Sequence, residues 1–233
     1  MFDLAGVLLD FGGVESVARL SKGQTDLATF DRFWSQSPWA EALYTGTCTP
    51  EAFAAGAVDE LGLNATPAEF LREFQAWLRG PYPGAFELVG QLRRHAKVAC
   101  LSNTNVLDVR RFRDELNLPS HFDACFFSNE IGHRKPNPGS YLHVLRAFGL
   151  ASLPDRALFF DDSAACVEGA RKVGMQAHRA CGVGEVHSCL AALGLPWSDG
   201  LWHGATTRLQ PAAVGAIMSR RGWKWSRRRR ASW

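Results

Sequence analysis

Residues 2–13 read FDLAGVLLDFGG, an apolar segment with an aspartate near its start and two glycines at its end. This pattern predicts a buried strand that leads into a glycine-rich turn. Almost nothing precedes Asp3, so we expect either a short first strand or a natural start that lies upstream of Met1. The carboxylate of Asp3 is therefore expected to lie on a buried strand at the start of the given sequence.

Beyond about residue 80, short apolar runs alternate with stretches of helical periodicity. We predict strands over 97–101, 124–127, 157–160 and 176–178. The intervening stretches predict helices over 86–94, 106–116, 140–148, 164–173 and 185–193. Strands that alternate with helices indicate an α/β fold with a Rossmann-like, doubly wound parallel sheet.

The stretch between these two regions has a different pattern, in which aromatic and aliphatic residues recur at helical spacing. Thr66 and Glu69 form a capping-box signature at the start of one predicted helix. We therefore expect an all-helical domain over residues 15–79. It would be inserted into an α/β core made of residues 1–14 and 80–196.

Polar residues end several of the predicted strands. Asp3, Ser102 and the pair Asp161-Asp162 each close an apolar run. Ligands of open parallel sheets bind beyond the carboxyl ends of the strands. Adjacent acids at such a place repel each other unless a cation lies nearby, and a hard cation such as Mg²⁺ prefers oxygen ligands. These residues therefore predict a site at one edge of the sheet.

Four segments occur in a defined order, namely 3–7, 101–103, 132–136 and 160–162. Together they resemble the four motifs of the haloacid dehalogenase superfamily, and the helical insertion resembles its C1-type cap. The similarity covers residues 2 to about 182 and is closest to the phosphatase-like branch. The resemblance implies a Mg²⁺-dependent phosphatase acting on a small phosphorylated metabolite such as a sugar phosphate.

The resemblance also implies roles for the metal ligands. Asp3 would be the nucleophile that forms an aspartyl-phosphate, and a carboxylate can act in this way. Asp3, Asp162 and the backbone carbonyl of Ala5 would hold Mg²⁺. Asp161 would assist this metal site through water.

The same resemblance implies phosphate-binding residues. Ser102 and Asn103 would bind the phosphate, and Lys135 would hold both the phosphate and Asp3. A lysine and a serine can neutralise and orient phosphoryl oxygens.

Two positions depart from the usual phosphatase pattern. Ala5 stands where a second aspartate normally serves as general acid and base, a loss that typically costs about 10²- to 10⁴-fold in rate. Such a loss is tolerable when the leaving group is already good. Cys166 stands where Asn or Asp is usual, and a thiol is a weak hydrogen-bonding group. We therefore expect looser positioning of Lys135 or of the metal.

Three alternatives stay open. One is a haloacid dehalogenase proper, which needs no metal and usually has an aromatic residue at the position of Ala5. Another is a phosphonoacetaldehyde-type hydrolase, which needs a cap lysine, and Lys22 is the only lysine before Ser102 besides Lys97. The third is a degenerate, non-catalytic family member, suggested by Ala5 and Cys166.

Composition constrains location and partners. No run approaches the roughly 20 apolar residues needed to span a bilayer, and the start of the chain lacks a basic leader. The six cysteines show no paired spacing, which favours reduced thiols over disulfides or a zinc site. We expect a cytoplasmic monomer or homodimer that has no membrane partner.

The C-terminal stretch 197–233 is strongly basic. It contains Asp199 as its single acid and eight of the 26 Lys and Arg residues of the chain. Five of the eight tryptophans also lie there. The lack of apolar periodicity favours a disordered extension over nucleic-acid binding through stacking and phosphate contacts.

Overall fold

The structure, a computed structural model, describes residues 1–12, 17, 19–21 and 26–195. The predictions for the basic tail and for Lys22 lie outside the described residues.

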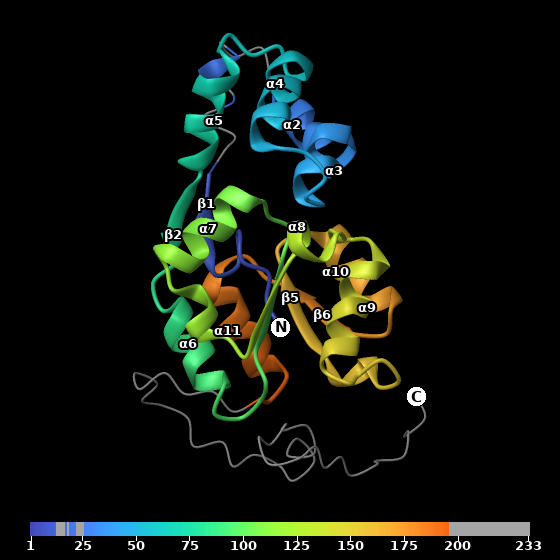
Figure 1. The fold of residues 1–233 in the computed structure, drawn as a ribbon. Helices are drawn as coiled ribbons and strands as arrows, with labels where there is room; N and C mark the ends of the chain where they lie inside the picture. The colour runs from blue at the N-terminus through green and yellow to red at the C-terminus, as the bar shows by residue number, and fades with distance from the viewer. Residues whose placement is uncertain (13–16, 18, 22–25, 196–233) are drawn as a thin grey trace.

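A parallel sheet forms the centre of the molecule (Figure 1). Strand β3 (Ala99–Ser102) pairs with β4 (Ala124–Phe127), and β5 (Leu158–Asp161) pairs with β6 (Gln176–Arg179). Phe2 makes parallel bridges to residues of both β3 and β5 and so joins the two pairs. The order across the sheet is therefore β4, β3, the N-terminal segment, β5, β6, which confirms the predicted α/β fold.

Helices cover both faces of this sheet. One face packs against α6 (Ala85–Leu92), α7 (Val106–Asp114) and α11 (Gly182–Ala192). The other face packs against α9 (Pro138–Ala147) and α10 (Ala164–Lys172). The short elements are α8 (Ser128–Ile131) and two 3-10 turns, η1 (Leu118–His121) and η2 (Pro154–Arg156). This arrangement gives two apolar layers that hold the strand ends in place.

The insertion leaves and re-enters the core through an antiparallel ribbon of β1 (Leu9–Phe11) and β2 (Leu78–Pro81). Between them lie α2 (Leu27–Gln36), α3 (Pro38–Tyr44), α4 (Pro50–Glu60) and α5 (Pro67–Gln75). They surround an aromatic core of their own that includes Phe53, Phe74 and Trp77. The predicted capping box of Thr66 and Glu69 is present at the start of α5.

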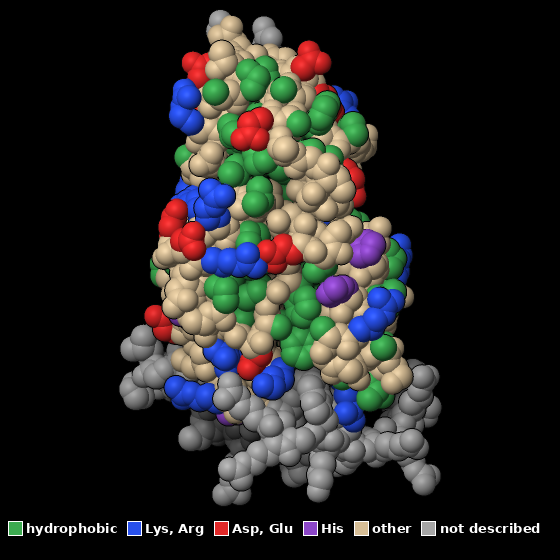
Figure 2. Space-filling view, in the orientation of Figure 1, with side chains coloured by type: hydrophobic (Ala, Val, Ile, Leu, Met, Phe, Trp, Pro, Cys, Tyr) green, Lys and Arg blue, Asp and Glu red, His purple; other side chains and the backbone are tan. Residues whose placement is uncertain are grey.

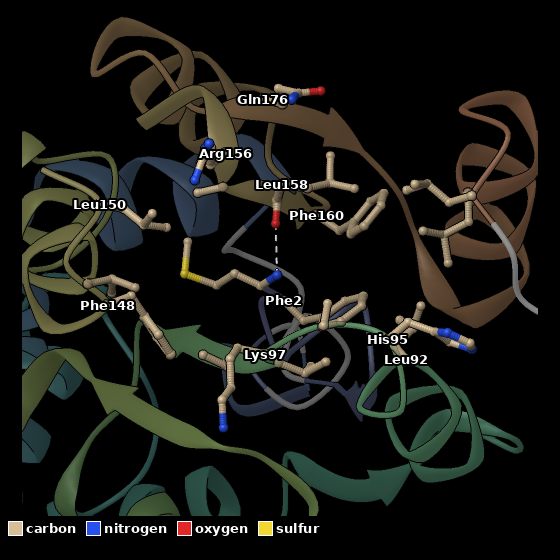
Figure 3. Close-up of a pocket in the computed structure, with 18 of the residues that line it drawn as sticks. Phe2, Leu92, His95, Lys97, Phe148, Leu150, Arg156, Leu158, Phe160 and Gln176 are labelled. Carbon is tan, nitrogen blue, oxygen red and sulfur yellow. Dashed lines mark hydrogen bonds between the residues drawn. The ribbon is translucent and has the colours of Figure 1, made fainter. Parts of the chain in front are cut away.

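An apolar cavity of about 210 Å³ lies at the amino ends of β3, β5 and β6 (Figure 3). The acids lie at the opposite, carboxyl ends of the strands. The ammonium group of Met1 donates to the carbonyl of Leu158 at 2.7 Å, and Phe2 N–H donates to the carbonyl of Ala99 at 2.9 Å. Leu101 N–H donates to the carbonyl of Phe2, and Phe160 N–H donates to the carbonyl of Met1. Backbone groups on one side of a strand recur every second residue, so we expect the N–H groups of Ala99 and Leu158 to face the cavity.

Among the described residues, no helix is both long and apolar enough to cross a bilayer.

Candidate active site

Asp3 lies at the carboxyl end of the central segment. Its N–H donates to the carbonyl of Phe160 at 2.8 Å, and its Oδ1 accepts from the N–H of Leu4 at 2.7 Å. Burial raises the pKa of Asp3 to about 7; Asp161 and Asp162 act in the same direction, while Lys135 opposes them. A carboxylate in this position gains stability from any positive charge brought close to it.

Lys135 supplies one such charge. Its Nζ lies 2.7 Å from Asp3 Oδ1 and 2.7 Å from Asp161 Oδ2, and its side chain is 1 % exposed. Burial alone would lower the pKa of Lys135, but the charges of Asp161 and Asp3 outweigh it and hold the pKa above its ordinary value. Lys135 is therefore a buried ammonium that bridges two carboxylates.

The two adjacent acids have different surroundings. Asp161, fully buried, uses both oxygens, since Oδ2 accepts from Lys135 and Oδ1 accepts from Ser163 N–H at 2.9 Å. Asp162 lies against Gly6, where the backbone has a φ of +76° and a methyl group would collide with the carboxylate. Glycine at position 6 thus lets Asp162 approach the turn that follows Asp3.

These residues form a group that could hold a divalent cation. Carboxylate oxygens of Asp3, Asp161 and Asp162 all lie within 4.8 Å of one another. The carbonyl of Ala5 accepts no backbone hydrogen bond from the described residues and lies in the same turn. The ammonium of Lys135 can balance only one of these three negative charges. A hard divalent cation, which prefers oxygen ligands, would balance the other two and would bind the carboxylate oxygens.

The predicted phosphate-binding residues follow β3. Ser102 is buried at the end of this strand, and its hydroxyl makes no hydrogen bond to any described residue. Asn103 is engaged differently: its Nδ2 donates to Lys135 O at 2.8 Å, and its Oδ1 accepts from Lys135 N–H at 2.7 Å. The structure therefore brings Asn103 to the backbone of Lys135, which it fixes from both sides.

The sequence did not identify a polar network just beyond Asn103. Ser128 binds the backbone of Thr104 through both its donor and acceptor functions, at 3.1 and 2.9 Å. Asn105 caps α7 and donates to Asp108 Oδ2 at 2.6 Å. Burial raises the pKa of Asp108 to about 6. The signal that could have revealed this cap was Asn105 followed three residues later by an acid.

Arg134 links the site to the helical insertion. Its Nε lies 2.6 Å from Glu41 Oε2, and its Nη1 donates to the carbonyl of Trp34 at 2.9 Å. Because Arg134 directly precedes Lys135, these contacts fix the insertion onto the loop that carries the buried ammonium. No local sequence pattern indicated this role of Arg134.

Cys166 lies on α10, where the charge of Lys135 acts on its thiol. The thiol is buried on α10, and the backbone carbonyl of Cys166 accepts from the hydroxyl of Tyr141 at 2.7 Å. Lys135 keeps both of its 2.7 Å contacts despite this substitution. Asn103 also holds the backbone of that residue, and looser positioning of Lys135 or of the metal stays a prediction.

The sequence profile of the haloacid dehalogenase-like hydrolases matches residues 1–174. The chain belongs to this family. It is a hydrolase of the family's α/β architecture, and the predicted membership is confirmed.

A phosphatase of Mycobacterium tuberculosis named MT3486 is 30 % identical over 190 residues, which cover 76 % of this chain and 84 % of that protein. Two solved structures show the same fold. A predicted haloacid dehalogenase-like hydrolase of Porphyromonas gingivalis has a TM-score of 0.66 at 24 % identity, covering 84 % of this chain and 97 % of that one. An enzyme of the family from Bacteroides thetaiotaomicron, in complex with magnesium and inorganic phosphate, has a TM-score of 0.61 at 20 % identity, covering 76 % and 91 %.

Proposed function

We propose that this hydrolase is a Mg²⁺-dependent phosphatase that acts on a small phosphorylated metabolite through an aspartyl-phosphate on Asp3. The observation that carries the proposal is the bridge from Lys135 to Asp3 and Asp161, beside Asp162. The similarity to a phosphatase of Mycobacterium tuberculosis supports the choice of phosphate esters.

The nucleophile in this proposal is Asp3 Oδ2. The other oxygen, Oδ1, is held by Leu4 N–H and by Lys135, so the carboxylate has a fixed orientation. Attack on phosphorus would form the aspartyl-phosphate, and water would then hydrolyse it. Residues 15–79 would act as a cap that closes over this centre.

Phosphate would be bound at the ends of β3 and of the loop that follows α8. The unengaged hydroxyl of Ser102 and the ammonium of Lys135 would contact its oxygens. Asn103 would contribute by holding the backbone of Lys135 in place. Charge-assisted contacts of this kind are stronger than neutral hydrogen bonds.

Asp3, Asp162 and the carbonyl of Ala5 would hold Mg²⁺, with Asp161 assisting through water. When bound, the cation supplies positive charge that stabilises the negative charge of the transferring phosphoryl group. A phosphorylated sugar fits this chemistry as a substrate.

Mutation of Asp3 tests the proposal directly. We expect wild-type protein to hydrolyse 4-nitrophenyl phosphate and members of a sugar-phosphate panel with Mg²⁺, and to lose this activity in EDTA. Asp3→Asn should reduce kcat by at least about 10³-fold. Asp10→Asn is a matched control, because Asp10 is half-exposed on β1 and pairs with Arg79 at 3.8 Å. Metal-independent turnover, or turnover that survives Asp3→Asn, would exclude this mechanism.

We also propose a cytoplasmic protein without a nucleic-acid partner. All six cysteines are free, as a reducing compartment allows. Acidic and basic side chains are interspersed on the face shown in Figure 2. Such a face lacks the continuous basic stripe that binds a phosphate backbone.

A further inference from the structure

Ala5 leaves the site without a proton donor two residues after Asp3. A leaving alcohol needs a proton when its phosphate ester breaks, unless it is a very good leaving group. A donor from elsewhere in the molecule would have to reach the space above Asp3. Helices α2 and α3 of the insertion contact Arg134, the neighbour of Lys135, so they are the nearest part of the insertion.

Three aromatic residues of the helical insertion differ in their surroundings. Trp34 packs in the aromatic core of the insertion, 6.0 Å from the ring of Phe74. Trp39 lies against Gly56 on the surface of the insertion. Tyr44 ends α3, at the junction between the cap and the core.

Tyr44 is held between two well-anchored side chains. Its ring stacks on Trp34 at 5.4 Å with an interplanar angle of 26°, and the guanidinium of Arg134 lies 6.0 Å from the ring centre. Two residues later, the backbone of Gly46 lies directly against the carbonyl of Asn129 on α8. Because Arg134 precedes Lys135, these contacts place Tyr44 over the loop that carries the buried ammonium.

The guanidinium of Arg134, the neighbour of Lys135, lies against the ring of Tyr44. The hydroxyl of Tyr44 makes no hydrogen bond to any described residue, and Asp108, Arg134 and Asp3 all act on it electrostatically. Burial raises the pKa of Tyr44 above its ordinary value, and Asp108 and Asp3 add to this effect. A tyrosine hydroxyl is protonated at neutral pH, so the Tyr44 hydroxyl can donate a hydrogen bond.

We propose that the Tyr44 hydroxyl contacts the leaving-group oxygen of the substrate and donates a proton to it. This rests on the proposed function. In the first step Asp3 Oδ2 bonds to phosphorus, the bond from phosphorus to the leaving oxygen breaks, and that oxygen takes the electron pair and the Tyr44 proton. In the second step water bonds to phosphorus, the aspartyl oxygen leaves with its electron pair, and the proton of water returns to Tyr44.

Tyr44→Phe tests the proposal while keeping the ring stacked on Trp34. For an alkyl phosphate such as glycerol phosphate, which has a poor leaving group, we expect kcat/KM to fall by at least about tenfold. For 4-nitrophenyl phosphate we expect a change of less than about twofold, because nitrophenolate leaves without a proton. Equal losses for both esters, or no loss for either, would overturn the proposal.

A binding measurement separates this inference from the proposed function. In an Asp3→Asn background, calorimetry should show that Tyr44→Phe weakens glycerol phosphate binding by about threefold or more, as for a lost hydrogen bond. Binding of inorganic phosphate should not change. Unchanged affinity for glycerol phosphate would contradict the role of Tyr44. Inactivity of the wild-type protein would instead count against the phosphatase assignment, and this binding result would still decide the contact.

Discussion

At the scale of single residues, charge balance around Lys135 dominates the candidate site. One ammonium group lies 2.7 Å from each of two carboxylates that are almost completely buried. A buried ion pair is a modest source of stability when intact, but losing one partner leaves an uncompensated charge in the interior. The same lysine is proposed to serve catalysis, so both roles depend on one side chain.

Lys135→Met should therefore destabilise the fold as well as abolish activity. Asp3 and Asp161 would be left facing each other without a positive charge, at a cost of about 3–5 kcal/mol. Urea denaturation measures this loss, and added Mg²⁺ should restore part of it by supplying positive charge. Lys172→Met on α10 is the control, since this lysine is exposed. An unchanged urea midpoint in Lys135→Met would contradict the expected charge balance.

Asp108 should make stability depend on pH. Burial raises the pKa of Asp108 in the folded protein to about 6, from 3.8 in a solvated chain. The folded state thus binds this proton more tightly, so its stabilising contribution is present below pH 4 and is lost as pH rises to about 6. The full effect is about 3 kcal/mol.

Asp108→Asn should remove this dependence, because an amide can still accept the hydrogen bond from Asn105 but does not ionise. Between pH 4 and pH 7, the free energy of unfolding should fall more steeply for wild-type protein than for Asp108→Asn. Asp114→Asn on the exposed side of α7 should behave like the wild type. Identical pH profiles for Asp108→Asn and the wild type would show that the carboxylate is not responsible.

At the scale of elements, local sequence patterns predicted most strands and helices. The strand 124–127 has the predicted limits, and the predicted helix 164–173 is observed as α10 (Ala164–Lys172). The β1–β2 ribbon was not predicted, because its strands have only three and four residues and show no clear alternation of apolar and polar side chains. Its pairing depends on contacts between segments far apart in the chain, which local patterns do not encode.

The candidate site shows the same division. The sequence could predict Asp3, Lys135 and the pair 161–162. Acids at strand ends that occur together with a lysine in a motif are seldom needed only to stabilise a fold. The contacts of Arg134 and Tyr44 could not be predicted, because they arise only when the insertion folds back onto the core. Tertiary contact, rather than local pattern, decides which residues of the helical insertion contact Arg134.

Arg134 provides the prediction at this scale. Arg134→Met should free α2 and α3 from the loop that carries Lys135, by removing the contacts with Glu41 and with the carbonyl of Trp34. Hydrogen exchange in α3 should become faster, and KM for phosphate esters should rise by about tenfold, since closure is then less favourable. Arg146→Met on α9 is an exposed arginine control. Unchanged exchange in α3 would show that Arg134 does not hold the cap.

At the scale of the whole molecule, an apolar cavity lies beside Met1 and Phe2, between the starts of β3 and β5 (Figure 3). Burial lowers the pKa of the Met1 ammonium to about 5. Ala99 of β3 and Leu158 of β5 line this cavity, so we expect it to accept extended apolar residues that pair with both strands.

An extension of Val-Val placed directly before Met1 should therefore stabilise the protein. Both residues would fill the cavity and accept hydrogen bonds from Ala99 and Leu158, for a net gain of about 1–3 kcal/mol after loss of chain entropy. Tm should rise by about 2–4 °C for each kcal/mol gained. Gly-Ser at the same place should give a smaller increase. A Val-Val variant no more stable than Gly-Ser would show that the cavity does not accept a strand.

The position of Met1 between β3 and β5 has a practical consequence for protein production. Residues added directly before Met1, such as those of a tag, would have to pass between these strands before they reached solvent, so they would contact the sheet interior. With a linker of charged or glycine-rich residues, the measured stability would then depend on the linker as well as on the enzyme. Expression yields and melting curves from N-terminally tagged protein should be compared only among identical linkers.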